Sequence, residues 1–185
     1  MKGRNNKMKK SHLLILAGVL VLLVTMCIGI SAEDTKGDTT VAKIDTTGYT
    51  SLAQAINAAK DGETIIVTAN TTLSETLEVK NKNITIKSES ADDIKTITYV
   101  SNYITVTADE GKTGSLTLEN ITITKQTGSA NGTYAILYPN TNGTVILNSG
   151  TTIKDSAAAH AGAAFAERGG AIVINDGALV ENCSS

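Results

Sequence analysis

Two kinds of side chain in this sequence have types and spacing that could do chemistry. The neighbouring carboxylates Asp92-Asp93 and Asp109-Glu110 resemble the acid pair of a glycoside hydrolase or part of a calcium site. His160 and Arg168 flank an alanine-rich segment and together imitate a catalytic base beside an anion clamp. What these groups can do depends on the segments that carry them.

The sequence around these groups indicates that they lie in solvent-exposed turns. Asp92-Asp93 lies in the polar stretch SESADDIK between two apolar runs, and Asp109-Glu110 lies in a similar stretch. Neither pair has an equivalent acid in a neighbouring run that would complete a metal site. The segment around His160 is expected to be a loop with the imidazole exposed. The sequence therefore predicts no catalytic, cofactor-binding or metal-binding residue.

The elements around these groups are expected to be short strands. After Gly62 no helical period appears, and apolar runs are separated by Asn, Gly and Asp. Several runs alternate an apolar residue with Thr, Glu or Lys, which gives one buried and one solvated face. The predicted strands are 64–67, 76–79, 83–86, 96–100, 103–106, 115–118, 120–123, 134–137, 144–147, 151–153 and 171–174.

A repeat relates these strands to one another. The segment 145–153, VILNSGTTI, aligns without a gap with 172–180, IVINDGALV, which defines a 27-residue repeat. Looser copies begin at Leu116 and Leu77. Repeats of this length that contain only short strands indicate a solenoid. A two-sheet sandwich also contains many short strands, but it does not require Asn or Gly at the same point of each unit.

The predicted fold class is therefore all-β, a parallel β-helix whose coils occupy residues 63–185. A buried Ile, Val or Leu contributes about 1.5–3 kcal/mol in such a stack, but only when the next coil covers it. Asn120, Asn148 and Asn175 fall at the corners between strands. Asn tolerates left-handed backbone there, and its amide can bond to the equivalent amide of the next coil.

A capping helix is expected ahead of the first coil. Ser51 and Gln54 form an S-x-x-Q capping box, and apolar residues three and four apart follow on one helical face before Gly62. The predicted helical segment is 49–62, and it would cover the open edge of the first coil. Residues 33–48 have few apolar residues and no period, which predicts a flexible linker.

Residues 1–32 have the layout of a secretory signal peptide. Five basic residues and no acid precede an uncharged apolar stretch from Leu13 to Ile30, and Ala32 offers a small residue for cleavage. An uncleaved membrane anchor is the alternative, and both place the remainder of the chain outside the cell.

The exported part is acidic and has a single cysteine. It holds 11 Lys and Arg against 18 Asp and Glu, a net charge of −7. This charge argues against nucleic acid as a partner, because neutralisation of phosphates supplies most of that affinity. Cys183 is its one cysteine, so no internal disulfide can form and stability must come from packing.

The segment 49–67, YTSLAQAINAAKDGETIIV, resembles the entry to the pectin-lyase-like superfamily, in which a capping helix precedes the first β-helix coil. The resemblance covers 49–185 and implies a right-handed parallel β-helix exposed outside the cell. The tetrapeptide at 169–172, GGAI, resembles the motif repeated in polymorphic outer-membrane proteins and adhesin-like surface proteins. The F-x-x-N tetrapeptide that accompanies it there is absent, because Phe165 is followed by Ala-Glu-Arg. Adhesion and polysaccharide processing are the two main activities that the superfamily implies.

These observations lead to one functional expectation and one alternative. We expect a secreted or cell-surface β-helix that acts as an adhesin or structural stalk and is not an enzyme in this portion. Its ligand would be a carbohydrate or a molecule on a neighbouring cell, met by loops 124–133 and 156–168. The alternative is the N-terminal part of a polysaccharide lyase or glycoside hydrolase with catalytic coils beyond Ser185. Both expect further coils, or a partner, to cover the last coil.

Four tyrosines are candidates for contact with sugars. Rings at strand ends can stack on sugar rings along one wall of the coil, although tyrosine in such positions also serves ordinary packing. The four residues are Tyr99, Tyr103, Tyr134 and Tyr138.

Overall fold

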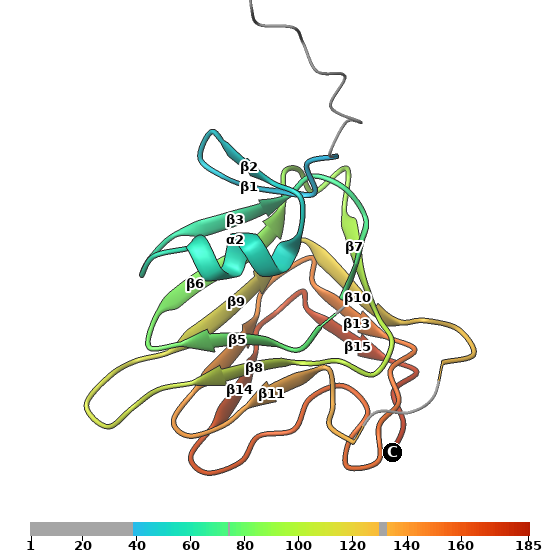
Figure 1. The fold of residues 1–185 in the computed structure, drawn as a ribbon. Coiled ribbons are helices and arrows are strands. Elements are labelled where there is room, and N and C mark those ends of the chain that lie inside the picture. The colour runs from blue at the N-terminus through green and yellow to red at the C-terminus, as the bar shows by residue number, and fades with distance from the viewer. Residues whose placement is uncertain (1–38, 74, 130–132) are drawn as a thin grey trace, which may run out of the picture. The chain divides into compact units, whose positions relative to one another are not determined.

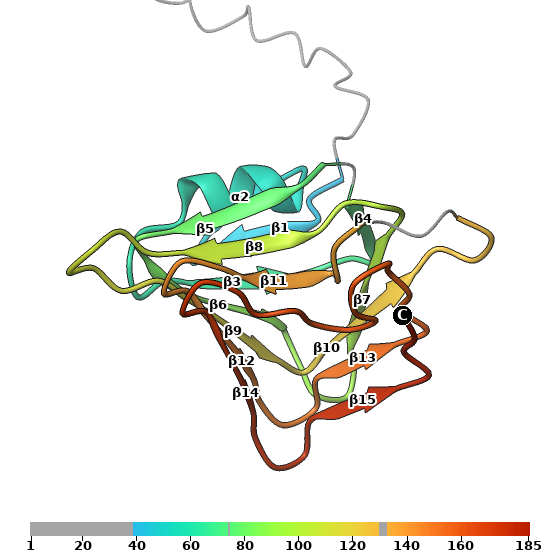
Figure 2. The same ribbon diagram turned by 90° about the horizontal axis from the view of Figure 1, so that it is seen from below.

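The structure is a computed structural model that describes residues 39–73, 75–129 and 133–185. The described chain consists mainly of strands in three largely parallel sheets, with one short helix (Figures 1 and 2). The predicted all-β class is therefore confirmed. The predicted signal peptide, 1–32, lies outside the described residues. In the part of the chain that is described, no helix is long and apolar enough to cross a membrane.

The three sheets share one pattern of connection. From β3 to β13 the chain visits the sheets in rotation, so each strand pairs in parallel with the strand three places further along. The seven-stranded sheet has the order β14 (Ala171–Ile174), β12 (Thr144–Leu147), β9 (Ser115–Glu119), β6 (Asn83–Ser88), β3 (Thr64–Val67), β1 (Ala42–Ile44) and β2 (Thr47–Tyr49). The five-stranded sheet has the order β15 (Leu179–Glu181), β13 (Thr152–Lys154), β10 (Ile121–Lys125), β7 (Lys95–Tyr99) and β4 (Thr71–Leu73). The three-stranded sheet has the order β11 (Leu137–Pro139), β8 (Ile104–Thr107) and β5 (Leu77–Lys80).

Columns of apolar side chains fill the space between the sheets. One column runs through Ile65, Ile86, Leu118, Leu147 and Ile174, which pair in register from strand to strand. The first four are buried, whereas Ile174 is 59% exposed because no described strand lies beyond β14. The burial of each apolar residue therefore depends on the next turn of the chain.

The strand register confirms the 27-residue repeat. Val145 pairs with Ile172, and Ile153 pairs with Val180. The looser copy at Leu116 is also correct, because Leu116 pairs with Val145. The copy at Leu77 is wrong, since Leu77 pairs with Ile104 in the three-stranded sheet. Loops of different lengths separate the strands of the earlier turns. Segments with similar sequences, such as those that begin at Leu77 and Leu116, therefore lie in different sheets.

The predicted strands are observed within a few residues, except for one that is displaced, and β1, β2, β4 and β15 were not predicted. The strand predicted at 134–137 is displaced, because β11 begins only at Leu137. The strand β4, at 71–73, has one apolar residue, Leu73, and that is too little to recognise as a strand from sequence.

The corner asparagines are confirmed in part. Asn175 donates from Nδ2 to Oδ1 of Asn148 at 2.7 Å, which is the predicted amide contact between successive turns. Asn120 has a φ of 47°, as expected. In the two later corners the left-handed residues are instead Gly150 and Gly177, with φ of 73° and 78°. A Cβ on Gly150 would lie 2.1 Å from Oδ1 of Asn120, so only glycine fits beneath that amide.

The helix α2 (Leu52–Ala58) lies against the first turn of the chain and packs on β1, β3 and β5 (Figure 2). Half of the predicted capping box is confirmed, because the side chain of Ser51 accepts a hydrogen bond from the backbone N–H of Gln54 at 3.2 Å. The side chain of Gln54 instead accepts from the backbone N–H of Thr50 at 3.2 Å. The buried residues of the helix are Leu52, Ala55 and Ile56, which join the core.

The predicted flexible linker, 33–48, is wrong over its last part. Residues 42–44 and 47–49 form the hairpin β1–β2, and β1 pairs antiparallel with β3. Ala42 and Ile44 are buried in the core. The hairpin extends the first edge of the seven-stranded sheet. The strand β1 was not predicted, because three residues among Thr and Asp give too weak an alternation of apolar and polar residues.

Lys82 ties the helix to the following turn of the chain. Its Nζ donates to the carbonyl oxygens of Ile56 at 2.6 Å and Ala59 at 3.0 Å. These carbonyls lie at the C-terminal end of the helix, where no intrahelical partner is available. Burial lowers the pKa of Lys82, and the charge of Glu63 partly opposes that effect.

We predict that Lys82→Met lowers the free energy of unfolding by about 1–3 kcal/mol, because two carbonyl oxygens lose a charged donor. Urea denaturation measures the change. Lys112→Met, at an exposed position, is the control and should stay within about 0.5 kcal/mol of the wild type. Equal stability of the two variants would show that Lys82 does not hold the helix.

A second prediction concerns Thr151, whose side chain is fully buried and whose Oγ1 has no hydrogen-bond partner among the described residues. Thr151→Val should raise the free energy of unfolding by about 1 kcal/mol, because a methyl group replaces an unsatisfied hydroxyl of the same size. The outward neighbour Thr152→Val is the matched control, with little expected change. A loss of stability in Thr151→Val would mean that its hydroxyl is satisfied in solution.

Candidate functional site

Five rings gather on the outer side of the three-stranded sheet and form the aromatic cluster, which consists of Tyr103, Tyr134, Tyr138, His160 and Phe165. Tyr138 lies in β11 and pairs with Thr105 of β8, whose neighbours Ile104 and Val106 point into the core. The strands therefore supply a platform, and the adjoining segments supply most of the rings.

The rings of the aromatic cluster touch one another in a connected set. Tyr134 stacks on Tyr138 with ring centroids 4.6 Å apart, and Tyr103 meets both of these rings edge-on at 5.3 and 5.7 Å. Phe165 stacks on Tyr138 at 5.9 Å. His160 lies 5.7 Å from both Phe165 and Tyr134. Each such pair contributes about 0.5–1.5 kcal/mol beyond its burial, so the cluster is held in one arrangement.

Phe165 reaches the cluster because its segment adds to the edge of β11. Leu137 forms a parallel bridge with Ala164, which is the same offset as in the repeat and places Phe165 beside Tyr138. The backbone N–H of Phe165 donates to the carbonyl of Leu137 at 3.0 Å. The turn that leaves this segment requires glycine, because a Cβ on Gly170 would lie 2.3 Å from the carbonyl oxygen of Pro139.

Polar groups lie at the rim of the aromatic cluster. The hydroxyl of Tyr138 donates to the carboxylate of Glu167, and Nδ2 of Asn140 donates to that hydroxyl at 3.2 Å. The hydrogen bond to Glu167, with burial next, raises the pKa of Tyr138 to about 12. The positive charge of Arg168 acts in the opposite direction. The rim therefore combines a carboxylate, an amide and a guanidinium beside the rings.

Three of the four tyrosines singled out in the sequence meet in the aromatic cluster, and the fourth does not. Tyr99 is buried, and its hydroxyl is hydrogen-bonded to Ser156 inside the protein. Burial is the first cause that raises the pKa of Tyr99. Its role is packing, whereas Tyr103 and Tyr134 are only half-buried.

The acidic pairs lie in separate turns. Asp93 pairs with Lys95 between β6 and β7, and Asp109 pairs with Lys80 at 3.1 Å after β8. A hydrogen bond from Asn81, with the contact to Lys80 next, holds the pKa of Asp109 below its ordinary value. Across the described ranges, no three His, Cys, Asp or Glu side chains are grouped as a metal ion would require.

His160 is exposed, as predicted, but its ring belongs to the aromatic cluster rather than to a base and clamp. The sequence did not single out Glu167 or the ring of Phe165. The repeat carried a usable signal, because the residue one repeat beyond Tyr138 is Phe165. The ungapped alignment of 145–153 with 172–180 does not reach these two residues, so the sequence alone did not pair them.

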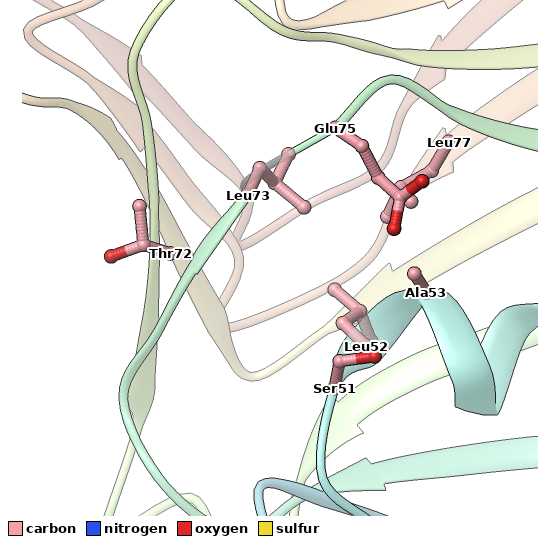
Figure 3. A pocket seen from close by; sticks show the side chains of 7 residues that line it. All are labelled: Ser51, Leu52, Ala53, Thr72, Leu73, Glu75 and Leu77. Atoms are coloured by element: carbon pink, nitrogen blue, oxygen red, sulfur yellow. The ribbon is translucent and has the colours of Figure 1, made fainter.

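A small pocket lies between the start of α2 and the segment from β4 to β5 (Figure 3). Its volume is about 10 Å³, which is at the lower limit for one water molecule. It cannot hold a sugar or a cofactor. Its lining residues are Ser51, Leu52, Ala53, Thr72, Leu73, Glu75 and Leu77.

We predict that Glu167→Gln lowers the pKa of Tyr138 from about 12 toward the ordinary value of about 10. The wild-type phenol keeps its proton in the folded state after the unfolded chain has lost it, so stability should fall with rising pH between about 10 and 12. That fall should be weaker in Glu167→Gln. Absorbance at 295 nm against pH, together with urea denaturation at several pH values, measures both effects.

Two controls accompany this titration. Tyr138→Phe should lack the tyrosine titration step that occurs at the highest pH. Its absence assigns that step to Tyr138. Glu119→Gln, on another sheet beside Lys87, should titrate as the wild type does. The same late transition in Glu167→Gln and in the wild type would contradict the proposed hydrogen bond.

No known protein family, curated protein or solved structure matches this chain. The aromatic cluster with its polar rim is the strongest candidate site in the described structure.

Proposed function

We propose that this chain is a secreted or cell-surface β-helix module that acts as an adhesin or structural stalk, with the aromatic cluster as its glycan-contacting face. Export is supported by the N-terminal sequence, where basic residues precede an uncharged apolar stretch. The stalk role is supported by the regular rotation of the chain through three sheets, since such a unit can be repeated to any length.

The architecture we infer is a right-handed parallel β-helix with α2 as its N-terminal cap. Parallel pairing of every third strand and the 27-residue register support the coil. Crossovers between parallel strands are right-handed in about 98% of cases, which supports the hand. The packing of α2 and of the β1–β2 hairpin on the first turn supports the cap.

The aromatic cluster is the observation that carries the proposal. Tyr103 and Tyr134 are half-buried and His160 is exposed, so part of each ring is available to a ligand. Flat apolar ring faces suit the C–H face of a pyranose, and a few placed polar groups fix the orientation of its hydroxyls. The rim residues that offer such groups are Asn140, Glu167 and Arg168.

Binding fits this site better than catalysis does. Hydrolysis of a glycoside uses two carboxylates, one on each side of the bond. The rim of the aromatic cluster brings one carboxylate, Glu167, and the hydroxyl of Tyr138 already occupies it. The imidazole of His160 faces Phe165 and Tyr134 rather than a carboxylate that would orient it as a base.

The proposal predicts that the exported chain binds oligosaccharides and that Tyr134→Leu weakens this binding about tenfold, equivalent to ~1.4 kcal/mol. Loss of one ring that stacks on the sugar accounts for a change of this size. A glycan array identifies the ligand, and titration calorimetry measures its affinity.

Tyr49→Leu is the matched control, because Tyr49 is also half-buried but lies in β2. It should bind as the wild type does. If no oligosaccharide binds, or if Tyr134→Leu and Tyr49→Leu behave alike, the aromatic cluster is a packing feature and the proposed function is wrong.

A further inference from the structure

The outer face of the five-stranded sheet carries threonines in a regular two-column array, the threonine grid. Its residues alternate with the buried Ile97, Ile123 and Ile153, so the threonine side chains point outward. One column is Thr96, Thr122 and Thr152, and the other is Thr72, Thr98 and Thr124. Lys154 extends the second column, so the interior of the grid carries no charge.

The strand register makes the spacing of the threonine grid regular in two directions. Neighbours along a strand are two residues apart, about 6.6 Å, and neighbours in adjacent strands are about 4.8 Å apart. Threonine is branched at Cβ and has few side-chain rotamers, which limits movement of each hydroxyl. The inward isoleucines fix the strands in the core. The six threonines therefore form an ordered array, which Leu179 and Glu181 of β15 continue beyond Thr152 and Lys154.

Each position of the threonine grid offers one methyl group and one hydroxyl. Within the described residues, none of the six hydroxyls has a hydrogen-bond partner. Among the described elements, no helix or other sheet packs on this face, which lies on one side of the molecule (Figures 1 and 2). Six neutral donors and acceptors therefore face the solvent in a chain that is otherwise acidic.

The shape and neutrality of the threonine grid restrict its partner. A small molecule is normally held in a concave site, and this face is a sheet surface. A polyanion requires clustered Lys or Arg, whereas the two columns of the grid carry one lysine, Lys154, at their border. A two-dimensional lattice of identical groups instead suits a solid surface that has a repeat of its own.

We propose that the threonine grid binds ice. Hydroxyl oxygens at fixed positions can replace water oxygens at the crystal surface, while the methyl groups between them order the adjacent water. A crystalline polysaccharide also presents a repeat, and it is the alternative outcome of the test. The grid lies on a different sheet from the aromatic cluster, so this activity is independent of the proposed glycan binding.

The test uses the full chain and a single ice crystal held just below its melting point. Wild-type protein should give faceted crystals and a gap between melting and growth temperatures that widens with protein concentration. Thr122→Lys should lose most of this gap, because Thr122 is bordered by Thr96, Thr152 and Thr124. Thr122→Ser should also reduce it, because the hydroxyl remains and the methyl group is lost.

Thr117→Lys is the matched control. Thr117 points outward from β9 and is half-buried, but it lies on the seven-stranded sheet between Thr85 and Ile146. It should retain the wild-type gap, and circular dichroism should show that every variant is folded.

Round crystals with no temperature gap would overturn the proposal. Equal loss in Thr117→Lys and Thr122→Lys would also overturn it, because the effect would then not belong to the threonine grid. Co-sedimentation with powdered chitin or cellulose that is lost in Thr122→Lys, retained in Thr122→Ser and accompanied by no effect on ice would assign the face to a polysaccharide instead.

Discussion

In-register parallel pairing of equivalent apolar residues is the constraint on which the rest of the structure depends. Ile84, Leu116, Val145 and Ile172 occupy one position in four successive strands of the sheet, and each of the first three is covered by the next. A shift of one residue in any strand would turn its apolar set outward. The same register fixes the positions of the outward residues. Outward side chains of successive strands therefore lie in rows on the surface, and contacts between those side chains are not needed to place them.

The ends of such a stack need different solutions from its middle. At the first turn, α2 and the β1–β2 hairpin supply apolar cover, and Lys82 satisfies the carbonyls at the end of the helix. At the last described turn, Val180 and Ile174 are 39% and 59% exposed, although their equivalents one turn earlier, Ile153 and Leu147, are buried. The difference arises because no described strand lies beyond them and not from residue type, since the 27-residue repeat keeps the apolar pattern.

Sequence predicted this fold where the repeat is uniform and failed where loop length varies. The segments 145–153 and 172–180 align without a gap, so their sequence alignment predicts the observed strand register. Earlier turns differ in length, because the turn from Ile65 to its partner Ile86 is shorter than the repeat and the turn from Ile84 to Leu116 is longer. Short strands contain too few residues to correct for such differences. For this reason the copy at Leu77 was assigned to the wrong sheet, and the three-residue strands β1, β2, β4 and β15 were missed.

The two outer faces show why the core is more predictable than a site. Most inward positions carry apolar residues, with Ser88 and Thr151 as exceptions, so their pattern recurs from turn to turn and can be read from one sequence. An outward position is free to vary, and it forms a surface feature only when neighbouring turns carry the same kind of residue. The aromatic cluster needs Tyr138 and Phe165 at equivalent places, together with the rings of Tyr103, Tyr134 and His160 from three connecting segments. The threonine grid needs Thr96, Thr122 and Thr152 in three adjacent strands. Both features depend on pairing between residues that lie a full turn apart in the chain. No single one of these residues gives a sequence signal of its own. Only the strand register shows that they form one surface.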